Sequence, residues 1–175
     1  MKTKELSAVP VGSIFELAGI SFVKLDEEGG HVLAVSKKAL FNSKFGKGSD
    51  LGKSVIKNAL EEEWLPKIEK AVGTENILEF ETDLLALDGT RPFENVVSKV
   101  SLPTLDIYRK YRNVFARFPS DSWWWLATPD SEECSSLIHC VSPSGLIDYY
   151  FCYNCSLGVR PFCHFVSSIL VSCDE

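Results

Sequence analysis

Two cysteines three positions apart are the first residues of this chain that could do chemistry. Cys152 and Cys155 have the Cys-x-x-Cys spacing of half a zinc site, and Cys163 follows, next to His164. A complete site would need a second pair at matching spacing, and the other cysteines and histidines are scattered. A redox role would need a helix after the first cysteine to lower its pKa, and the pattern there predicts none. Zinc or thiol binding by Cys152, Cys155 and Cys163 is kept as an alternative to ordinary structural thiols.

Nucleophilic catalysis needs a side chain within hydrogen-bond reach of a base. The chain has three histidines, His31, His139 and His164, and none lies in a nucleophile motif. The sequence also lacks G-x-S-x-G and the glycine patterns of phosphate-binding and dinucleotide-binding loops. We therefore predict that the protein is not an enzyme and uses no cofactor.

The segment 148–156, DYYFCYNCS, is rich in aromatic and small polar residues and has no lysine or glutamate. Tyrosine and phenylalanine offer a large contact area with few rotatable bonds, and serine and asparagine adapt their hydrogen bonds. Tyrosine is also favoured among the residues that dominate interface energies. The composition fits a recognition surface, and it also fits a strand in a core, where lysine and glutamate are scarce.

The whole chain has the composition of a soluble globular protein. Its 175 residues are 45% hydrophobic and 24% charged, and a domain of this size can bury a core without metal or disulfides. The net charge of −6 argues against nucleic acid and anionic membranes as partners. The sequence has no signal-peptide core and no apolar run long enough to span a membrane. We expect a cytoplasmic protein whose cysteines are reduced.

The two ends of the chain differ in composition. Every lysine lies at or before Lys110, all six cysteines lie at or after Cys134, and residues 135–173 contain no Lys, Glu, Met or Trp. Because no Pro/Gly/Ser linker marks the change, we predict one domain over 1–175 with a specialised C-terminal third.

Local patterns predict an α+β fold with helices in the middle and antiparallel strands at the end. Residues 13–40 indicate three strands, with a turn at DEEGG. Residues 48–72 indicate a helix that Ser49 or Asp50 caps and that Pro66 ends or kinks, and a second helix begins after Thr104. The C-terminal third is predicted as strands 136–141, 146–153 and 159–167, joined by turns at 142–145 and near Gly158.

Two motifs in this last third resemble those of a bacterial and phage domain family of unknown function. That family carries W-W-L-R-S-P and, after a strand and a glycine turn, G-V-R-P. The matching residues here are Trp124, Trp125, Leu126, Thr128 and Pro129 for the first motif and Gly158, Val159, Arg160 and Pro161 for the second. Ala127 stands where the family has arginine, so a role of that arginine is not carried over. The opening strands and DLGKSVIKNALEEEWL also resemble the family.

The family is similar to the C-type-lectin fold, which formylglycine-generating enzymes share. The resemblance implies a domain with a twisted antiparallel sheet and about two helices. It implies that the tryptophans pack in the core and that Arg160 is a buried structural cation, paired with a carboxylate or with backbone carbonyls. Alternation along a strand adds that at least one of the tryptophan rings faces out. An oxidase of the formylglycine-generating type is a third possibility, but the cysteine pair of that family is not recognisable here.

Folds of this kind also serve as variable proteins of diversity-generating retroelements. Adenine-directed mutation of AAY codons yields Tyr, Phe, Cys, Ser, Asp, His and others, but never Lys, Glu, Gln, Met or Trp. Residues 135–173 fit this set. The resemblance therefore implies a binding protein with a diversified surface within 123–173, a phage or prophage source and possible association with a virion. The alternative is an invariant zinc-binding, thiol-binding or structural domain of a phage or prophage protein.

On the first interpretation the ligand contacts are aromatic and small polar side chains: Tyr149, Tyr150, Phe151, Tyr153 and Asn154, with Ser135, Ser136 and His139 beside them. The two motifs at 124–129 and 158–161 form the fixed scaffold. We expect a protein ligand in preference to a glycan and no calcium, because the C-terminal third offers only Asp148, Asn154, Asp174 and Glu175 as ligands for that ion. The sequence sets neither the identity of the ligand nor the oligomeric state.

Overall fold

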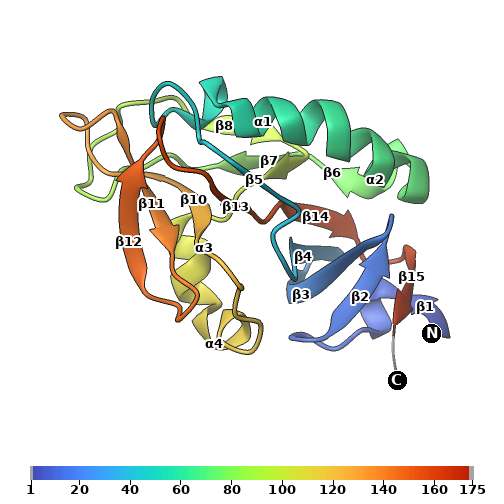
Figure 1. The fold of residues 1–175 in the computed structure, drawn as a ribbon. Helices are drawn as coiled ribbons and strands as arrows, with labels where there is room; N and C mark the ends of the chain where they lie inside the picture. The colour runs from blue at the N-terminus through green and yellow to red at the C-terminus, as the bar shows by residue number, and fades with distance from the viewer. Residues whose placement is uncertain (1, 174–175) are drawn as a thin grey trace.

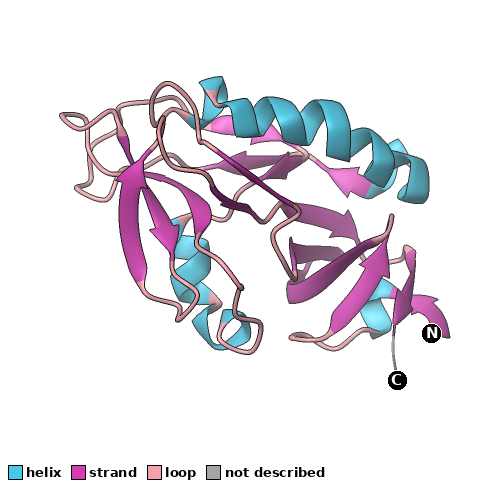
Figure 2. Cartoon of the chain, in the orientation of Figure 1, coloured by secondary structure: helices cyan, strands magenta, loops and turns pink. Residues whose placement is uncertain are grey.

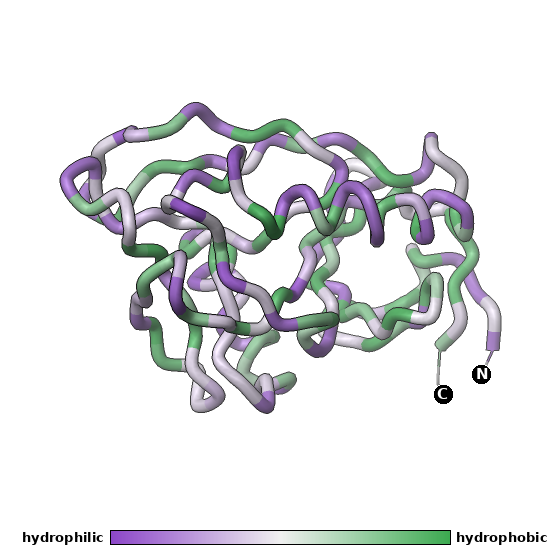
Figure 3. Tube along the Cα trace, turned by 45° about the horizontal axis from the view of Figure 1, so that its top comes forward, coloured by the Kyte–Doolittle hydropathy of each residue, from purple (hydrophilic) through white to green (hydrophobic). Residues whose placement is uncertain are grey.

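The computed structural model describes residues 2–173 and has an α+β architecture, which confirms the predicted class (Figures 1 and 2). Strands predominate, and one long helix lies across the top of the view in Figure 1. Figure 3 shows hydrophobic and hydrophilic residues interspersed along the whole described trace. Among residues 2–173, no helix is long and apolar enough to cross a membrane.

The larger sheet has eight strands and brings the two ends of the chain together. Its order is β1-β15-β2-β3-β4-β14-β6, and β9 also pairs with β14. β1 pairs with β15 in antiparallel register, so both termini lie at the same edge (Figure 1). The bounds of these strands are β1 (Lys2–Glu5), β2 (Ile14–Leu17), β3 (Ile20–Glu28), β4 (His31–Ser36), β6 (Ile77–Leu78), β9 (Val100–Ser101), β14 (Phe162–Val166) and β15 (Leu170–Cys173).

The second sheet has five strands in the order β12-β11-β10-β13-β5, and a separate two-stranded ribbon pairs β7 with β8. Within the five-stranded sheet only β10 and β13 run parallel. The bounds are β5 (Phe41–Ser43), β10 (Trp124–Pro129), β11 (Leu137–Val141), β12 (Ile147–Phe151), β13 (Leu157–Val159), β7 (Phe80–Thr82) and β8 (Val96–Ser98).

The long helix consists of α1 (Val55–Ala59), a π-helical turn over Leu60–Trp64 and α2 (Leu65–Val72). The cap differs from the prediction: Asp50 caps the short 3-10 turn Leu51–Lys53, and the Ser54 hydroxyl caps α1 by accepting from the Lys57 amide at 3.0 Å. Pro66 does not end the helix. Because proline cannot donate a backbone hydrogen bond, it sits in the first turn of α2, directly after the widened π turn.

Two further helices and three short 3-10 turns complete the fold. Thr104 caps α3 (Leu105–Lys110), as predicted, and α4 (Arg112–Phe115) follows directly. Both pack against the five-stranded sheet through Tyr108 and Phe115, whose rings contact Trp124 at centroid distances of 5.8 and 5.6 Å. The remaining 3-10 turns are Leu6–Ala8 and Thr74–Asn76.

β10 lies between two hydrophobic clusters, and its alternating side chains enter both. Trp125 and Ala127 belong to the larger cluster, which includes the long helix, while Trp124 and Leu126 belong to the cluster under α3 and α4. Both tryptophans are at most 1% exposed. The expectation that one of these rings faces out is therefore wrong for Trp124 and Trp125, because both faces of the sheet are covered. Trp123, just before the strand, is half-buried.

The C-terminal strands differ from the prediction at Gly158. This residue lies inside β13 and not in a turn, and the predicted strand 159–167 is divided into β13 and β14 at Arg160 and Pro161. A Cβ atom on Gly158 would lie 2.8 Å from the Ala39 Cβ and 3.2 Å from the Trp123 carbonyl oxygen. The glycine therefore permits close backbone approach. The reversal after β12 occurs instead at 152–154.

Candidate functional site

The predicted recognition segment forms β12 and the turn after it, at the free edge of the five-stranded sheet (Figure 1). β12 pairs with β11 along its whole length, from Ile147 opposite Val141 to Phe151 opposite Leu137. In the described part of the chain, no strand pairs with the other edge of β12. The connecting turn 142–145 ends at Gly145, whose φ of +84° suits glycine.

Four large side chains on β12 and its following turn are exposed, and together they form what we call the aromatic strip: Ile147, Tyr149, Phe151 and Tyr153. Their exposed fractions are 43%, 52%, 46% and 50%. Residues 147, 149 and 151 share one face because side chains alternate along a strand. The rings of Phe151 and Tyr153 lie 5.7 Å apart. The strip is thus a contiguous apolar and aromatic surface.

The backbone beneath the strip is fixed at Cys152, between Phe151 and Tyr153. The Cys152 side chain is fully buried. Its amide donates to the Ser136 carbonyl at 2.9 Å, and its carbonyl accepts from the amides of Phe45 and Gly46 at 2.9 and 3.1 Å. The exposed rings are therefore held on a scaffold that is hydrogen-bonded from both sides.

The other predicted contacts have different positions. Tyr150 points to the opposite face, where it is half-buried and meets the Trp123 ring edge-on at 5.3 Å. Asn154 and Ser135 are exposed, and Ser136 is half-buried. A surface hollow of about 430 Å³ lies between the strip and the turn, and it is lined by Leu137, Tyr149, Tyr150, Phe151, Asn154 and Cys155.

His139 is not part of the exposed surface. It is 3% exposed, its Nε2 lies 3.1 Å from the Asp130 carboxylate, and its Nδ1 has no hydrogen-bond partner in residues 2–173. The Tyr149 ring covers it edge-on at a centroid distance of 6.2 Å. Its predicted role as a ligand contact is therefore corrected, because the pairing of β11 with β12 places it under Tyr149.

The surroundings of the strip carry charges of both signs, because exposed Lys44 and Lys47 flank the two residues, Phe45 and Gly46, whose amides bond to the Cys152 carbonyl. The sequence has no lysine or arginine from 118 to 159, whereas Asp148 and Glu133 are exposed in this stretch.

The cysteines do not form the alternative zinc site. Cys152 and Cys155 lie beside the five-stranded sheet, whereas Cys163 lies on β14 of the other sheet. Residues 2–173 contain no group of three or more His, Cys, Asp or Glu side chains placed to hold a metal ion; Asp174 and Glu175 lie outside the described residues. Burial raises the pKa of Cys140 to about 12 and also raises the pKa values of Cys152 and Cys163. These three thiols are therefore protonated and unreactive at neutral pH.

Arg160, from the second motif, is buried as predicted, with 1% of its surface exposed. Its Nε donates to the Ser36 carbonyl at 3.0 Å, which agrees with the predicted backbone pairing. No carboxylate among the described residues pairs with it, and its Nη2 has no hydrogen-bond partner. Burial lowers the pKa of Arg160 from 12.5 to about 10, which corresponds to about 3 kcal/mol against the charged form.

The guanidinium of Arg160 lies between two aromatic rings, 4.7 Å from the centroid of Trp124 and 5.5 Å from that of Phe115. Trp124 is thus the partner of Arg160, so the two sequence motifs meet in the core. Sequence reasoning missed two groups near these sites, Asp130 beside His139 and Arg112 on α4. Neither lies in a motif, and only the folded chain shows their neighbours.

Comparison of the chain with protein-family models, with curated proteins and with solved structures found no match in any of the three.

Proposed function

We propose that this protein is a non-catalytic binding protein that presents the aromatic strip to a protein partner. The observation that carries the proposal is the exposure of four large apolar side chains, each 43% or more, on one edge strand and its turn. Single exposed apolar residues are ordinary, but a contiguous group of them indicates an interaction surface.

The physical properties of the strip suit protein recognition. Tyrosine and phenylalanine lose little conformational entropy on binding, and the hydrogen bonds at Cys152 already fix the backbone. Although the Tyr149 amide donates to the Asp148 carboxylate at 2.8 Å, no described strand pairs with the outer edge of β12, and an extended segment of a partner could pair with the rest of that edge. The hollow of about 430 Å³ beside Tyr149 and Phe151 gives such a partner a place for one side chain.

We further propose the finer assignment that the resemblance implies: a C-type-lectin-like domain whose residues 123–173 vary through a diversity-generating retroelement, in a phage or prophage protein. Two features support it. The strip draws on residue types that mutated AAY codons encode, and Trp124, Arg160 and Gly158, from the two motifs, are buried. Sequencing the 3′ end of the gene and its downstream flank across a population tests this assignment. A near-copy with AAY at the codons of Tyr149, Tyr150 and Tyr153 is expected, and an invariant tract with no such copy would overturn it.

The binding function itself is tested with a matched pair of triple variants. Tyr149→Ala/Phe151→Ala/Tyr153→Ala removes the aromatic strip, whereas the control Val11→Ala/Val97→Ala/Leu170→Ala removes exposed apolar side chains elsewhere. Immobilised wild-type protein is used to retain binding partners from the source organism. Each retained protein is then purified, and its affinity for wild type and for the two variants is measured by titration. The strip variant should lose at least tenfold in affinity, while the control stays within twofold. Equal affinities for the strip variant and wild type would refute the proposal.

A further inference from the structure

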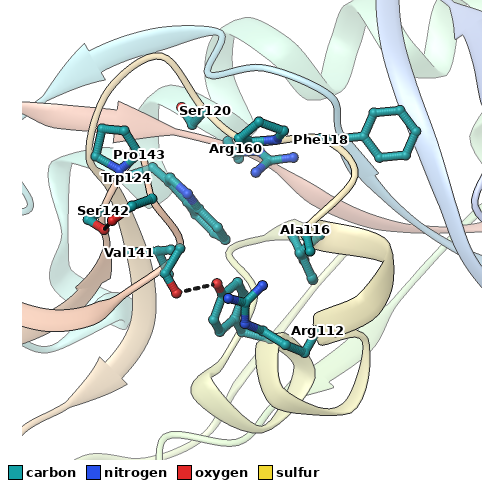
Figure 4. A pocket seen from close by; sticks show the side chains of 14 residues that line it. Arg112, Ala116, Phe118, Ser120, Trp124, Val141, Ser142, Pro143 and Arg160 are labelled. Atoms are coloured by element: carbon teal, nitrogen blue, oxygen red, sulfur yellow. Dashed lines mark hydrogen bonds between the residues drawn. The ribbon is translucent and has the colours of Figure 1, made fainter.

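We infer that the pocket between β10, the 142–145 turn and α3–α4 is a binding site for a small oxyanion, a phosphate or carboxylate group held by Arg160 and Arg112. The pocket is separate from the aromatic strip, and the inference does not rest on the proposed function. Figure 4 shows its walls, with Arg160 in the upper part of the view, Arg112 in the lower part and the indole of Trp124 between them.

The first observation is the unpaired donor of Arg160. Its side chain lines the pocket and is 1% exposed, yet Nη2 has no partner in residues 2–173. The rings of Trp124 and Phe115 face the plane of the guanidinium, and such contacts offset only part of the cost of burying a charge. The faces of the two rings cannot accept a hydrogen bond from Nη2, because its N–H groups lie in the plane of the guanidinium. An oxyanion in the pocket would satisfy both the charge and this donor.

The second observation is Arg112, which lines the same pocket from α4. Its guanidinium lies 5.5 Å from the centroid of the Tyr108 ring. Among the residues that the structure describes, no carboxylate forms an ion pair with Arg112. Gly145 makes room for this placement: a Cβ there would lie 3.0 Å from Arg112 Nη2 and 3.2 Å from the Tyr108 hydroxyl. The Tyr108 hydroxyl donates to the Gly145 carbonyl at 2.8 Å, which fixes the turn against the helix.

The lining and size of the pocket fit a small anion. Its fourteen lining residues include two arginines and three serines, Ser120, Ser142 and Ser144, but no aspartate or glutamate. Its volume is about 100 Å³, which is room for several water-sized groups and too small for a ligand of drug size. Arginine pairs with phosphate and carboxylate groups through two parallel hydrogen bonds. Charge, donors and volume therefore select a phosphate or carboxylate group.

The test uses the full chain with ¹⁵N-labelled arginine, titrated with phosphate or acetate at constant ionic strength set with chloride. The Arg160 and Arg112 guanidinium resonances should shift in a saturable manner, and the fluorescence of the tryptophans should change with the same dissociation constant. A response to phosphate alone identifies a phosphate site, and a stronger response to acetate identifies a carboxylate site. No saturable shift at Arg160 with either anion, or the same shift with chloride, would overturn the inference.

Two variants assign the binding to the pocket without disturbing Arg160 in the core. Arg112→Gln removes one charged donor and should weaken binding about tenfold or more. Arg117→Gln removes the same charge from an exposed position that does not line the pocket, and it should change binding less than twofold. Equal losses in the two variants would mean that the anion responds only to the general field of the protein, and would likewise overturn the inference.

Discussion

The neighbouring residues Tyr149 and Tyr150 give a sharp test of which face of β12 is free. The two side chains have the same chemistry and point to opposite faces of one strand. Tyr149 is 52% exposed, and full burial of a large side chain contributes about 1.5–3 kcal/mol. Truncation of Tyr149 to alanine should therefore cost about 1 kcal/mol.

Tyr150→Ala should cost more, because its ring is half-buried and meets Trp123 edge-on at 5.3 Å. An aromatic pair of this kind adds about 0.5–1.5 kcal/mol to the contribution of burial, so we expect about 2–3 kcal/mol. Trp125→Ala removes a side chain from the core and should cause the largest loss in the free energy of unfolding, about 3–5 kcal/mol.

The free energy of unfolding is measured for each variant by urea denaturation, with unchanged m-values as the control for two-state behaviour. The expected order of cost is Tyr149, then Tyr150, then Trp125. Tyr153→Ala, at 50% exposure, should fall beside Tyr149. A cost for Tyr149 equal to or above that for Tyr150 would refute the assignment of the free face, and with it the aromatic strip.

Three further predictions concern protonation, thiol reactivity and packing. Burial and the neighbouring His31 lower the pKa of His164 to about 4. Because the folded protein keeps His164 neutral, the contribution of this residue to the free energy of unfolding is complete above about pH 6.5. About 2 kcal/mol of that free energy, after allowance for the partial exposure of the side chain, is lost as the pH falls from 6.5 through 4. Unfolding measured from pH 7 to 4 should show this loss in wild type and not in His164→Gln. Cys134 is exposed and Cys155 only half-buried, so an aromatic disulfide reagent should modify Cys134 fastest in the native protein, and Cys134→Ser should remove this fast phase. Rapid native reaction of the buried thiols Cys140, Cys152 and Cys163 would contradict the structure. Gly158→Ala should lower the free energy of unfolding by about 1–3 kcal/mol through overpacking, and an unchanged urea midpoint would contradict the close approach of β13.

Local signals predicted the ends and faces of several elements correctly. The threonine at 104 caps α3, and β4 begins at His31, directly after the predicted turn. The prediction failed where a signal has two physical meanings. The glycine at 158 predicts a turn, but glycine also permits close packing of two backbones, and only the neighbours Ala39 and Trp123 distinguish these cases.

The candidate site shows the same division. The residue types of 148–156 predicted a strand with a recognition composition, but alternation alone leaves the choice of exposed face open. The structure makes that choice by placing Tyr150 against Trp123 and leaving Tyr149 and Phe151 outside. It also buries His139, which its sequence neighbours gave no reason to expect.

The sequence by itself determined the α+β class, the positions of β11 and α3, and the separation of a lysine-free C-terminal third, because these depend on local propensity and composition. The tertiary structure alone decided which side chains of β12 are exposed, which thiols are inert, and that Arg112 lines the same pocket as Arg160. These features depend on contacts between residues tens of positions apart. Burial, and the charge and hydrogen-bond balance that follows from it, exists only once those segments have packed together.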